Sequence, residues 1–202
     1  MQALQRFTAG QSQADSAVDN YVRTQLAGDD PKLYLATLGG GSIASLAGQD
    51  GTGAGAPRLL QRLPNGSVQA KGYTYAFDGL GRVETTRGTL TLEQGVRDPR
   101  LQREAGGADR RTTDDGGHIV GHRFNPPSEE FNLFAQDANF NRGAYRQLEN
   151  EWAIALRDRR TVKVEWKFEY SGSSVRPDSL KVNYWVDGKP HERVFNNARG
   201  GR

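Results

Sequence analysis

Residues 141–158 read Asn141-Arg-Gly-Ala-Tyr-Arg-Gln-Leu-Glu-Asn-Glu-Trp-Ala-Ile-Ala-Leu-Arg-Asp158 and contain the clearest helical pattern of the chain. Apolar side chains recur there at helical intervals, at Tyr145, Leu148, Trp152, Ala155 and Leu156. Because an α-helix turns once in about 3.6 residues, these positions form a single stripe. We therefore predict an amphipathic helix over residues 142–158 with its stripe against the core.

Two polar residues share the inward side of this helix. Glu149 falls at the edge of the apolar stripe, and Asn141 falls on the same side when the wheel is extended backwards. Asn141 also stands where asparagine is favoured as an N-cap. A partly buried carboxylate needs a partner, which a metal ion, an arginine or ordered water can supply. Asn141 and Glu149 can therefore face one buried spot.

A second informative stretch is Asp114-Asp-Gly-Gly-His118. Its two glycines permit positive φ and let the backbone approach a ligand closely. The short apolar runs Ile119-Val120 and Phe131–Phe134 lie on either side of a Pro-Pro turn, and each predicts a strand. The strand next to His118 can bring this histidine to the spot that Asn141 and Glu149 face.

Strand patterns surround these stretches, and an Asp187-Gly188 hairpin turn follows the penultimate one. Residues 94–117 are polar and rich in arginine, so we predict a long surface loop there. The predicted strands span Tyr73–Phe77, Arg82–Leu92, Thr161–Tyr170, Ser179–Val186 and His191–Phe195. Strands around one central helix indicate an α+β fold with a mainly antiparallel sheet.

Composition divides the 202 residues near residue 56. Residues 1–56 carry three basic and five acidic residues, and we predict a helical segment followed by a glycine-rich linker. Residues 57–202 carry 24 basic and 19 acidic residues and form the predicted functional domain. A basic surplus confined to this domain favours polyanionic partners such as nucleic acids.

Several classes of protein are excluded or disfavoured by composition. The chain has no cysteine, which excludes disulfides, thiolate catalysis and cysteine zinc sites. It has no run of about 20 apolar residues, so we predict no membrane-spanning helix. No N-terminal signal peptide is visible, although a protein can be exported as part of a larger polypeptide.

The two motifs together resemble the DNA/RNA non-specific endonuclease family, which has the ββα-metal (His-Me finger) fold. That family carries Asp-Arg-Gly-His, then Asn-x-Gly, then a helix with Glu eight residues after the Asn. Here these are Asp115-Gly-Gly-His118 and Asn141-Arg-Gly, followed by Glu149. Asn132 also matches a family asparagine, whereas the motif arginine, which contacts phosphate in the Serratia-type branch, is Gly116 here.

One branch of the family is especially similar, namely the C-terminal toxin modules of large bacterial secreted proteins. Members combine Asp-Asp-Gly-Gly-His and Asn-Arg-Gly with a downstream motif, present here as Tyr170-Ser-Gly-Ser-Ser-Val-Arg-Pro177. The resemblance covers about residues 70–197. It implies a toxin that is secreted or delivered into a target cell, acts in its cytoplasm in interbacterial competition, and has a cognate immunity protein. The charge of the chain predicts that this partner is acidic.

The resemblance implies sequence-non-specific, Mg²⁺-dependent cleavage of DNA, with Mn²⁺ as another cation and RNA as a second substrate left open. Such hydrolysis needs a base to activate water and a cation to stabilise the charge on phosphate. His118 would be the base, Asn141 would bind the metal directly, Glu149 would orient its water, and Asn132 would position the site. The rival interpretation is a non-catalytic nucleic-acid-binding or interaction module on the same scaffold, which the missing motif arginine favours.

The remaining charged residues receive weaker interpretations. Arg123 or Arg142 would take over the phosphate contact of the motif arginine, and Asp115 would support the turn. His122 is predicted to lie in a loop or on the surface, with a substrate contact as the lesser alternative, and His191 is predicted to be solvent-exposed in a terminal hairpin. A cluster of five arginines is either a solvated loop or a phosphate-tracking edge of the cleft: Arg97, Arg100, Arg103, Arg110 and Arg111.

Overall fold

The computed structural model describes residues 60–63 and 66–201. The chain divides into two compact units between Arg82 and Val83. In the first unit, β1 (Leu60–Arg62), β2 (Val68–Ala70) and β3 (Tyr73–Phe77) form an antiparallel meander. The strand predicted over residues 73–77 is thus confirmed. The helical segment predicted within residues 1–56, and the domain boundary at its end, lie outside the described residues.

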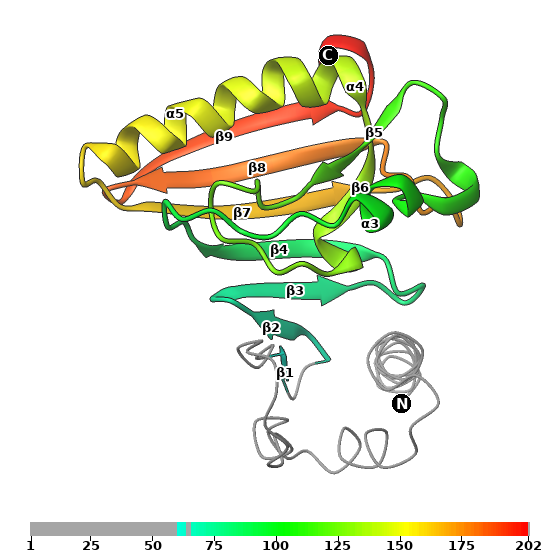
Figure 1. Cartoon of the computed structure of the whole chain (residues 1–202), viewed down its shortest axis with the longest axis horizontal. Coiled ribbons are helices and arrows are strands. Elements are labelled where there is room, and N and C mark those ends of the chain that lie inside the picture. The colour runs from blue at the N-terminus through cyan, green and yellow to red at the C-terminus, as the bar shows by residue number, and fades with distance from the viewer. Residues whose placement is uncertain (1–59, 64–65, 202) are drawn as a thin grey trace, which may run out of the picture. The chain divides into compact units, whose positions relative to one another are not determined.

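The second unit is built on four antiparallel strands in the order β4 (Val83–Thr89), β7 (Val162–Glu169), β8 (Ser179–Val186) and β9 (Lys189–Asn196) (Figure 1). Alternate side chains of β7 and β8 are buried, as period-two patterns require. The predicted hairpin turn joins β8 to β9, since Asp187 and Gly188 both adopt positive φ, 51° and 81°. The α+β class with a mainly antiparallel sheet is confirmed.

One continuous helical segment crosses a face of this sheet. It consists of α4 (Ala138–Phe140), a π-helical turn η5 (Asn141–Tyr145) and α5 (Arg146–Arg157). The predicted stripe faces the core, where the ring of Trp152 lies edge-on to two sheet residues. Its centroid is 5.9 Å from that of Trp166 and 5.6 Å from that of Tyr184.

The start of this helix differs from the prediction. Asp137 is the N-cap, and its Oδ1 accepts hydrogen bonds from the backbone N–H groups of Asn139 and Phe140 at 3.0 and 3.1 Å. Asn141 therefore lies inside the helix, with φ −56° and ψ −52°. The helix begins one turn earlier because Asp137 caps it and the buried Phe140 extends its apolar side. The π-turn then widens the backbone at Asn141.

A two-stranded ribbon packs on the same face of the sheet. In it, β5 (Asp114–His118) pairs with β6 (Leu133–Asp137), and Phe134 contacts Phe168 of β7 with ring centroids 5.3 Å apart. The motif itself is thus the strand, and the prediction of a strand at Ile119-Val120 is wrong. These two residues are buried immediately after β5, where tertiary contacts rather than a ladder hold them. The strand predicted from Phe131 begins later, after a 3₁₀ turn at Glu130–Asn132.

The prediction of a loop over residues 94–117 is also partly wrong. It contains helix α3 (Pro99–Glu104) and a 3₁₀ turn at Gly107–Asp109 before β5 begins. Helix α3 buries none of its side chains, so it shows no apolar stripe in sequence. Its signals are the Asp98 N-cap and the proline at its first position. None of the described helices has the length and apolar content that a membrane crossing requires.

Candidate active site

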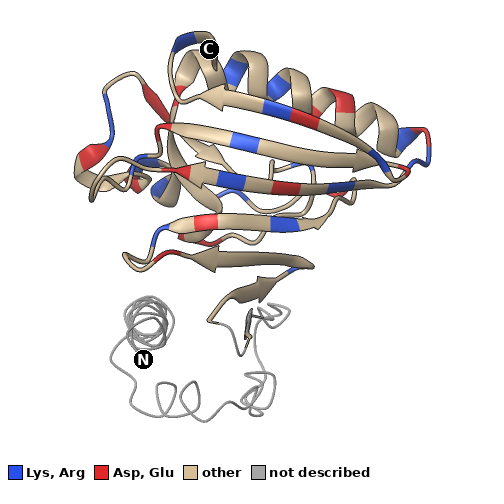
Figure 2. Ribbon diagram, turned by 180° about the vertical axis from the view of Figure 1, so that it is seen from behind, with Lys and Arg blue, Asp and Glu red and all other residues tan. Residues whose placement is uncertain are grey.

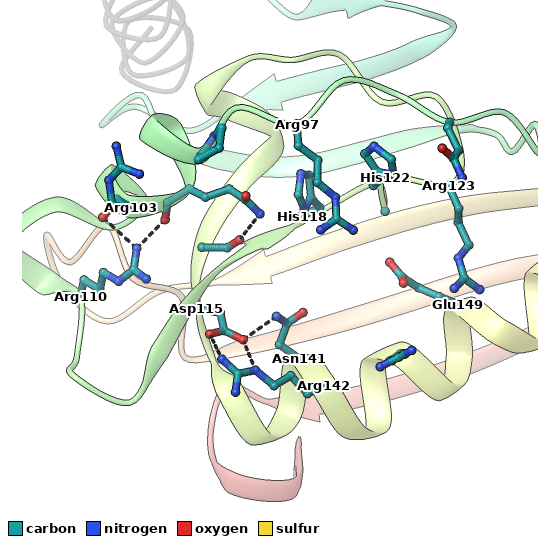
Figure 3. Close-up of a pocket in the computed structure, with 16 residues that line it drawn as sticks. Arg97, Arg103, Arg110, Asp115, His118, His122, Arg123, Asn141, Arg142 and Glu149 are labelled. Atoms are coloured by element: carbon teal, nitrogen blue, oxygen red, sulfur yellow. Dashed lines mark hydrogen bonds and ion pairs between the residues drawn. The ribbon is translucent and has the colours of Figure 1, made fainter.

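A pocket of about 760 Å³ lies between β5 and the helical segment of the second unit (Figure 3). His118, Asn141 and Glu149, which the sequence placed near one spot, all line it. Only two carboxylates, those of Asp115 and Glu149, share the pocket with six arginines: Arg97, Arg103, Arg110, Arg123, Arg142 and Arg146. The pocket is therefore strongly cationic and suits a polyanion.

His118 is the last residue of β5, and the backbone just beyond it is firmly held. The side chain of Asn132 is 1% exposed and pairs with both backbone groups of Val120. Its Oδ1 accepts from the Val120 N–H at 3.0 Å, and its Nδ2 donates to the Val120 carbonyl at 3.2 Å. Asn132 does not line the pocket, so these contacts make it a positioning residue for the strand end that carries His118.

Tyr145 holds the same strand end from the other side. Its hydroxyl donates to the carbonyl of Ile119 at 2.5 Å and accepts from Trp166 Nε1 at 2.9 Å. This chain of bonds ties the residue after His118 to the π-turn and to β7. The sequence placed Tyr145 only in the apolar stripe. The available signal was chemical, because a buried tyrosine hydroxyl needs a hydrogen-bond partner.

Burial controls the charge of His118. It lowers the pKa of the imidazole to about 4, and the cationic Arg97 and the neighbouring His122 act in the same direction. The ring is therefore neutral near pH 7, the state in which a histidine accepts a proton. No described residue forms a hydrogen bond or ion pair with this side chain, so its nitrogens remain available to a ligand.

Glu149 is the second perturbed group of the pocket. Burial raises its pKa to about 7, although Arg123, Arg146 and Arg97 oppose this shift. The ion pair with Arg146 or a strand arginine that could have explained this residue does not form among the described residues. A glycine that the sequence did not single out makes room for it. A Cβ on Gly121 would overlap Oε1 of Glu149 and lie 2.7 Å from its Cδ.

Asn141 is oriented by a carboxylate from β5. Its Nδ2 donates to Oδ2 of Asp115 at 2.9 Å, which leaves Oδ1 of the amide as the end available to a cation (Figure 3). Arg142 donates to both oxygens of the same carboxylate, at 2.9 and 2.7 Å. Burial works to raise the pKa of Asp115, but these hydrogen bonds outweigh it and the pKa is lowered. Asp115 thus reaches across to the helix, instead of supporting its own turn.

The two arginines predicted to contact phosphate both line the pocket. Arg142 is engaged by Asp115, and Nη1 of Arg123 donates to Oδ1 of Asn150 at 2.7 Å. Of the two other histidines, His122 lies in a loop as predicted, whereas His191 differs from the prediction. His122 is half-buried and lines the same pocket, and His191 is half-buried against Tyr184, with stacked rings 4.8 Å apart. A short-range pattern does not reveal either contact.

The glycines of Asp114-Asp-Gly-Gly-His118 differ in part from the prediction. Neither adopts positive φ. A Cβ on Gly116 would overlap the carbonyl oxygen of Gln102 and lie 2.6 Å from its carbonyl carbon, because α3 packs directly on β5. A Cβ on Gly117 would overlap Gln136 in the same way. Close packing within the protein requires both glycines, and Gly116 also lines the pocket.

The downstream motif residues 170–177 meet the first motif in three dimensions. Arg176 donates from Nε and Nη2 to the two oxygens of Asp114, at 2.8 and 2.9 Å, and the two side chains are 5% and 0% exposed. Arg176 also donates to the carbonyl of Asn197. This buried ion pair links the loop after β7 to the start of β5, which gives a physical reason for the joint presence of the two motifs.

Charges elsewhere on the second unit are arranged differently. Basic and acidic residues are interspersed on β7 to β9, and on β7 lysine and glutamate alternate (Figure 2). Several are paired, including Lys167 with Glu165 at 3.3 Å and Lys181 with Glu192 at 2.9 Å. The basic residues of these strands are mostly lysines, whereas all the basic residues of the pocket other than its histidines are arginines.

Comparison with known proteins identifies this arrangement. Residues 64–188 match the family model described as DNA/RNA non-specific endonuclease. The chain belongs to this family. It is 36% identical over 133 residues to the type VII secretion system protein EssD of Staphylococcus aureus (strain USA300), a match that covers 62% of this chain and 22% of EssD. It is 29% identical over 132 residues to the probable deoxyribonuclease RhsA of Dickeya dadantii (strain 3937), covering 63% of this chain and 9% of RhsA.

Solved structures share the fold. NucA from Streptococcus agalactiae, determined with a magnesium ion bound, superposes with a TM-score of 0.51 at 12% identity, over 63% of this chain and 71% of NucA. The Sda1 nuclease with a bound zinc ion superposes with a TM-score of 0.53 at 14% identity, over 66% of this chain and 76% of Sda1. These similarities confirm the ββα-metal nuclease fold that the motifs predicted.

Proposed function

We propose that the chain is a metal-dependent, sequence-non-specific endonuclease that hydrolyses phosphodiester bonds in DNA. The observation that carries this proposal is the pocket itself, which combines a neutral histidine, an oriented amide and a half-buried carboxylate with a surplus of arginines. Membership of the endonuclease family supports it. Binding alone would need the arginines but not His118, Asn141 and Glu149 together.

The residues present fit a hard divalent cation. The donors offered are oxygens, namely Oδ1 of Asn141 and the carboxylate of Glu149, and such ligands suit Mg²⁺ and Mn²⁺. Eight helical residues separate the two by about 12 Å along the axis. In line with the family resemblance, Asn141 would bind the ion directly, and Glu149 would orient its water. When bound, the cation supplies stabilisation for the negative charge that develops on the phosphate.

His118 performs the proton transfer. Water adds to phosphorus as one P–O ester bond breaks, the neutral imidazole accepts the proton that the attacking water loses, and the departing ester oxygen takes up a proton from solvent. Its low pKa in the free protein keeps it unprotonated throughout the neutral range. The negative charge of a bound phosphate opposes that of Arg97, which raises the basicity of His118 when substrate is present. Asn132 and Tyr145 keep the strand end in place during this step.

The direct test is the digestion of plasmid DNA and of a structured RNA by the full chain, with Mg²⁺, Mn²⁺ or EDTA. We expect cleavage with the metals, none with EDTA, and a loss of about 10²–10⁴-fold in rate for His118→Ala. His191→Ala is the matched control, since His191 stacks on Tyr184 away from this pocket. Cleavage that resists EDTA or survives His118→Ala would refute the mechanism. Binding without cleavage would instead establish the non-catalytic module.

We extend the proposal to a toxin that is delivered into a target cell and acts in its cytoplasm. The similarity to a protein named for type VII secretion supports export from the producing cell. A nuclease without sequence preference endangers its producer, so a cognate immunity protein has to be present there. The arginine-lined pocket predicts an acidic partner that covers it. Affinity purification of the His118→Ala chain from the producing cell should recover such a protein, and recovery of no tight acidic partner would contradict this extension.

A further inference from the structure

The pocket has no arginine at the position where the Asp-Arg-Gly-His motif has one. Gly116 stands there, and the carbonyl group of Gln102 fills the space that a side chain would need. A phosphate in the pocket must therefore be bound by a cation from another element. The hydrogen bonds of the six arginines show which of them are already engaged.

Three of the six arginines have partners within the protein. Arg142 binds Asp115 through two bonds, and Arg123 binds Asn150. Arg110 donates to the backbone carbonyls of Gln102, Arg103 and Asp114 at 2.6, 2.9 and 2.9 Å, and so fastens α3 to β5. Among the described residues, the guanidinium groups that form no hydrogen bond or ion pair in this pocket are those of Arg97, Arg103 and Arg146.

Arg97 is the one of these three whose charge acts on His118. Its charge lowers the pKa of both His118 and His122 and also acts on Glu149, so it reaches groups on both sides of the pocket. Among the pKa shifts of His118, His122 and Glu149, Arg146 contributes only to the shift of Glu149. Arg103 contributes to none of the three. Figure 3 shows the Arg97 guanidinium beside the His118 ring, directed into the pocket.

The backbone on the N-terminal side of Arg97 is fixed to the loop after β5. The N–H of Gly95 donates to the carbonyl of His122 at 2.8 Å, and Ser128 Oγ donates to the carbonyl of Val96 at 3.1 Å. Gly95 also packs tightly, since a Cβ there would lie 2.7 Å from Cδ of Pro126. The segment that leads to Arg97 is therefore held against the loop that carries His122.

The C-terminal side of Arg97 is fixed by a helix cap. Oδ1 of Asp98 accepts from the N–H groups of Arg100 and Leu101 at 2.8 and 3.2 Å and starts α3. Arg97 is thus one residue between two anchored segments. Its backbone is pre-organised while its guanidinium has no protein partner, which is the arrangement expected of a ligand-binding arginine.

We propose that Arg97 binds the reacting phosphate of the nucleic acid beside His118 and replaces the arginine that Gly116 excludes. This inference rests on the proposed nuclease function. The planar guanidinium can donate two parallel N–H bonds to two phosphate oxygens, which a lysine ammonium cannot reproduce. The contact fixes the phosphorus next to the base and stabilises the charge that grows on its oxygens during hydrolysis.

The test compares Arg97→Ala and Arg97→Lys with Arg100→Ala in the full chain. Arg100 is the matched control because it pairs with Glu104 on the exposed side of α3 and does not line the pocket. We expect Arg97→Ala to lower kcat/KM for duplex DNA by about 10²–10³-fold, by analogy with the loss of one donor to a transition-state oxyanion. Arg97→Lys should recover only part of this loss, and Arg100→Ala should stay within about twofold of the parent chain.

Binding without cleavage separates this inference from the proposed function. In EDTA, fluorescence polarisation with a labelled duplex should show that Arg97→Ala reduces the dependence of log K on log salt by about one phosphate contact. A parent chain that binds but never cleaves refutes the nuclease function, while the change in slope still supports the phosphate contact. If Arg97→Ala matches Arg100→Ala in both rate and slope, or if Arg97→Lys is fully active, the inference is wrong.

Discussion

Replacing Arg176 by methionine should destabilise the second unit strongly, although Arg176 does not line the pocket. The change leaves the Asp114 carboxylate buried, with the N–H of Arg111 as its remaining described donor. The substitution removes two charge-assisted hydrogen bonds from Arg176 to Asp114, at 2.8 and 2.9 Å. The two side chains are 5% and 0% exposed. Removal of one partner from a buried ion pair typically costs about 3–5 kcal/mol of unfolding free energy. At this domain size, each kcal/mol corresponds to about 4 °C in Tm.

The assay is guanidinium unfolding at pH 7, followed by tryptophan fluorescence and combined with thermal melts. Arg160→Met is the control, because the ion pair of Arg160 with Asp187 has the same 2.8 Å distance but side chains that are 47% and 51% exposed. Such exposed pairs contribute at most about 1 kcal/mol. The double change Arg176→Met with Asp114→Leu should regain part of the loss, since no unpaired charge then stays buried.

The pH dependence gives a second check of the same reasoning. Burial alone would raise the pKa of Asp114, but the hydrogen bonds from Arg176 and Arg111 outweigh it and the pKa is lowered. The stabilisation from Asp114 is therefore present above its unfolded pKa of about 3.9 and is lost as the pH falls through the lower folded value. The difference in unfolding free energy between the parent chain and Arg176→Met should therefore become smaller at acid pH. A loss no larger than that of Arg160→Met, or a deficit unchanged between pH 7 and pH 3, would refute the reasoning.

Three further predictions concern the pocket. Asp115→Ala should weaken Mn²⁺ binding about 10–100-fold in an electron paramagnetic resonance titration, because the Asn141 amide loses the acceptor that orients it; unchanged binding would show that the amide is held otherwise. Gly121→Ala should lower cleavage about tenfold or more, since its Cβ displaces the Glu149 carboxylate, and its effect on Tm should be smaller than that of Arg176→Met. Full activity of this variant would mean that Glu149 tolerates the shift. In metal-free protein, the NMR signals of the His118 ring should titrate with a midpoint below pH 5, because burial and Arg97 disfavour the imidazolium; a midpoint above pH 6 would contradict the burial argument.

Local pattern was sufficient for much of the fold. The stripe that contains Leu148 and Trp152 predicted the helix, and period-two alternation predicted β7 and β8 with their turn at Asp187-Gly188. These features depend on residues within a few positions of one another, so the sequence displays them directly. The same holds for the shared side of Asn141 and Glu149, because one helix carries both.

Other features depended on contacts between distant segments. The motif residues of β5 lack the β-branched and aromatic side chains typical of strands, so only pairing with β6 reveals the strand. Helix α3 was missed because it buries no side chain. The helix begins after Asp137 rather than at Asn141, because Asp137 caps the first turn and Phe140 in that turn is buried.

The site shows the same division. By themselves, the motifs of the sequence selected His118, Asn141 and Glu149 as one constellation, because their types and spacing carry the chemistry. Only the tertiary structure decided that Asp115 turns the Asn141 amide, that α3 excludes a side chain at Gly116, and that Arg97 stands free beside His118. The physical reason is that orientation, burial and charge at a site are set by atoms from several segments, whose meeting no spacing within one segment can specify.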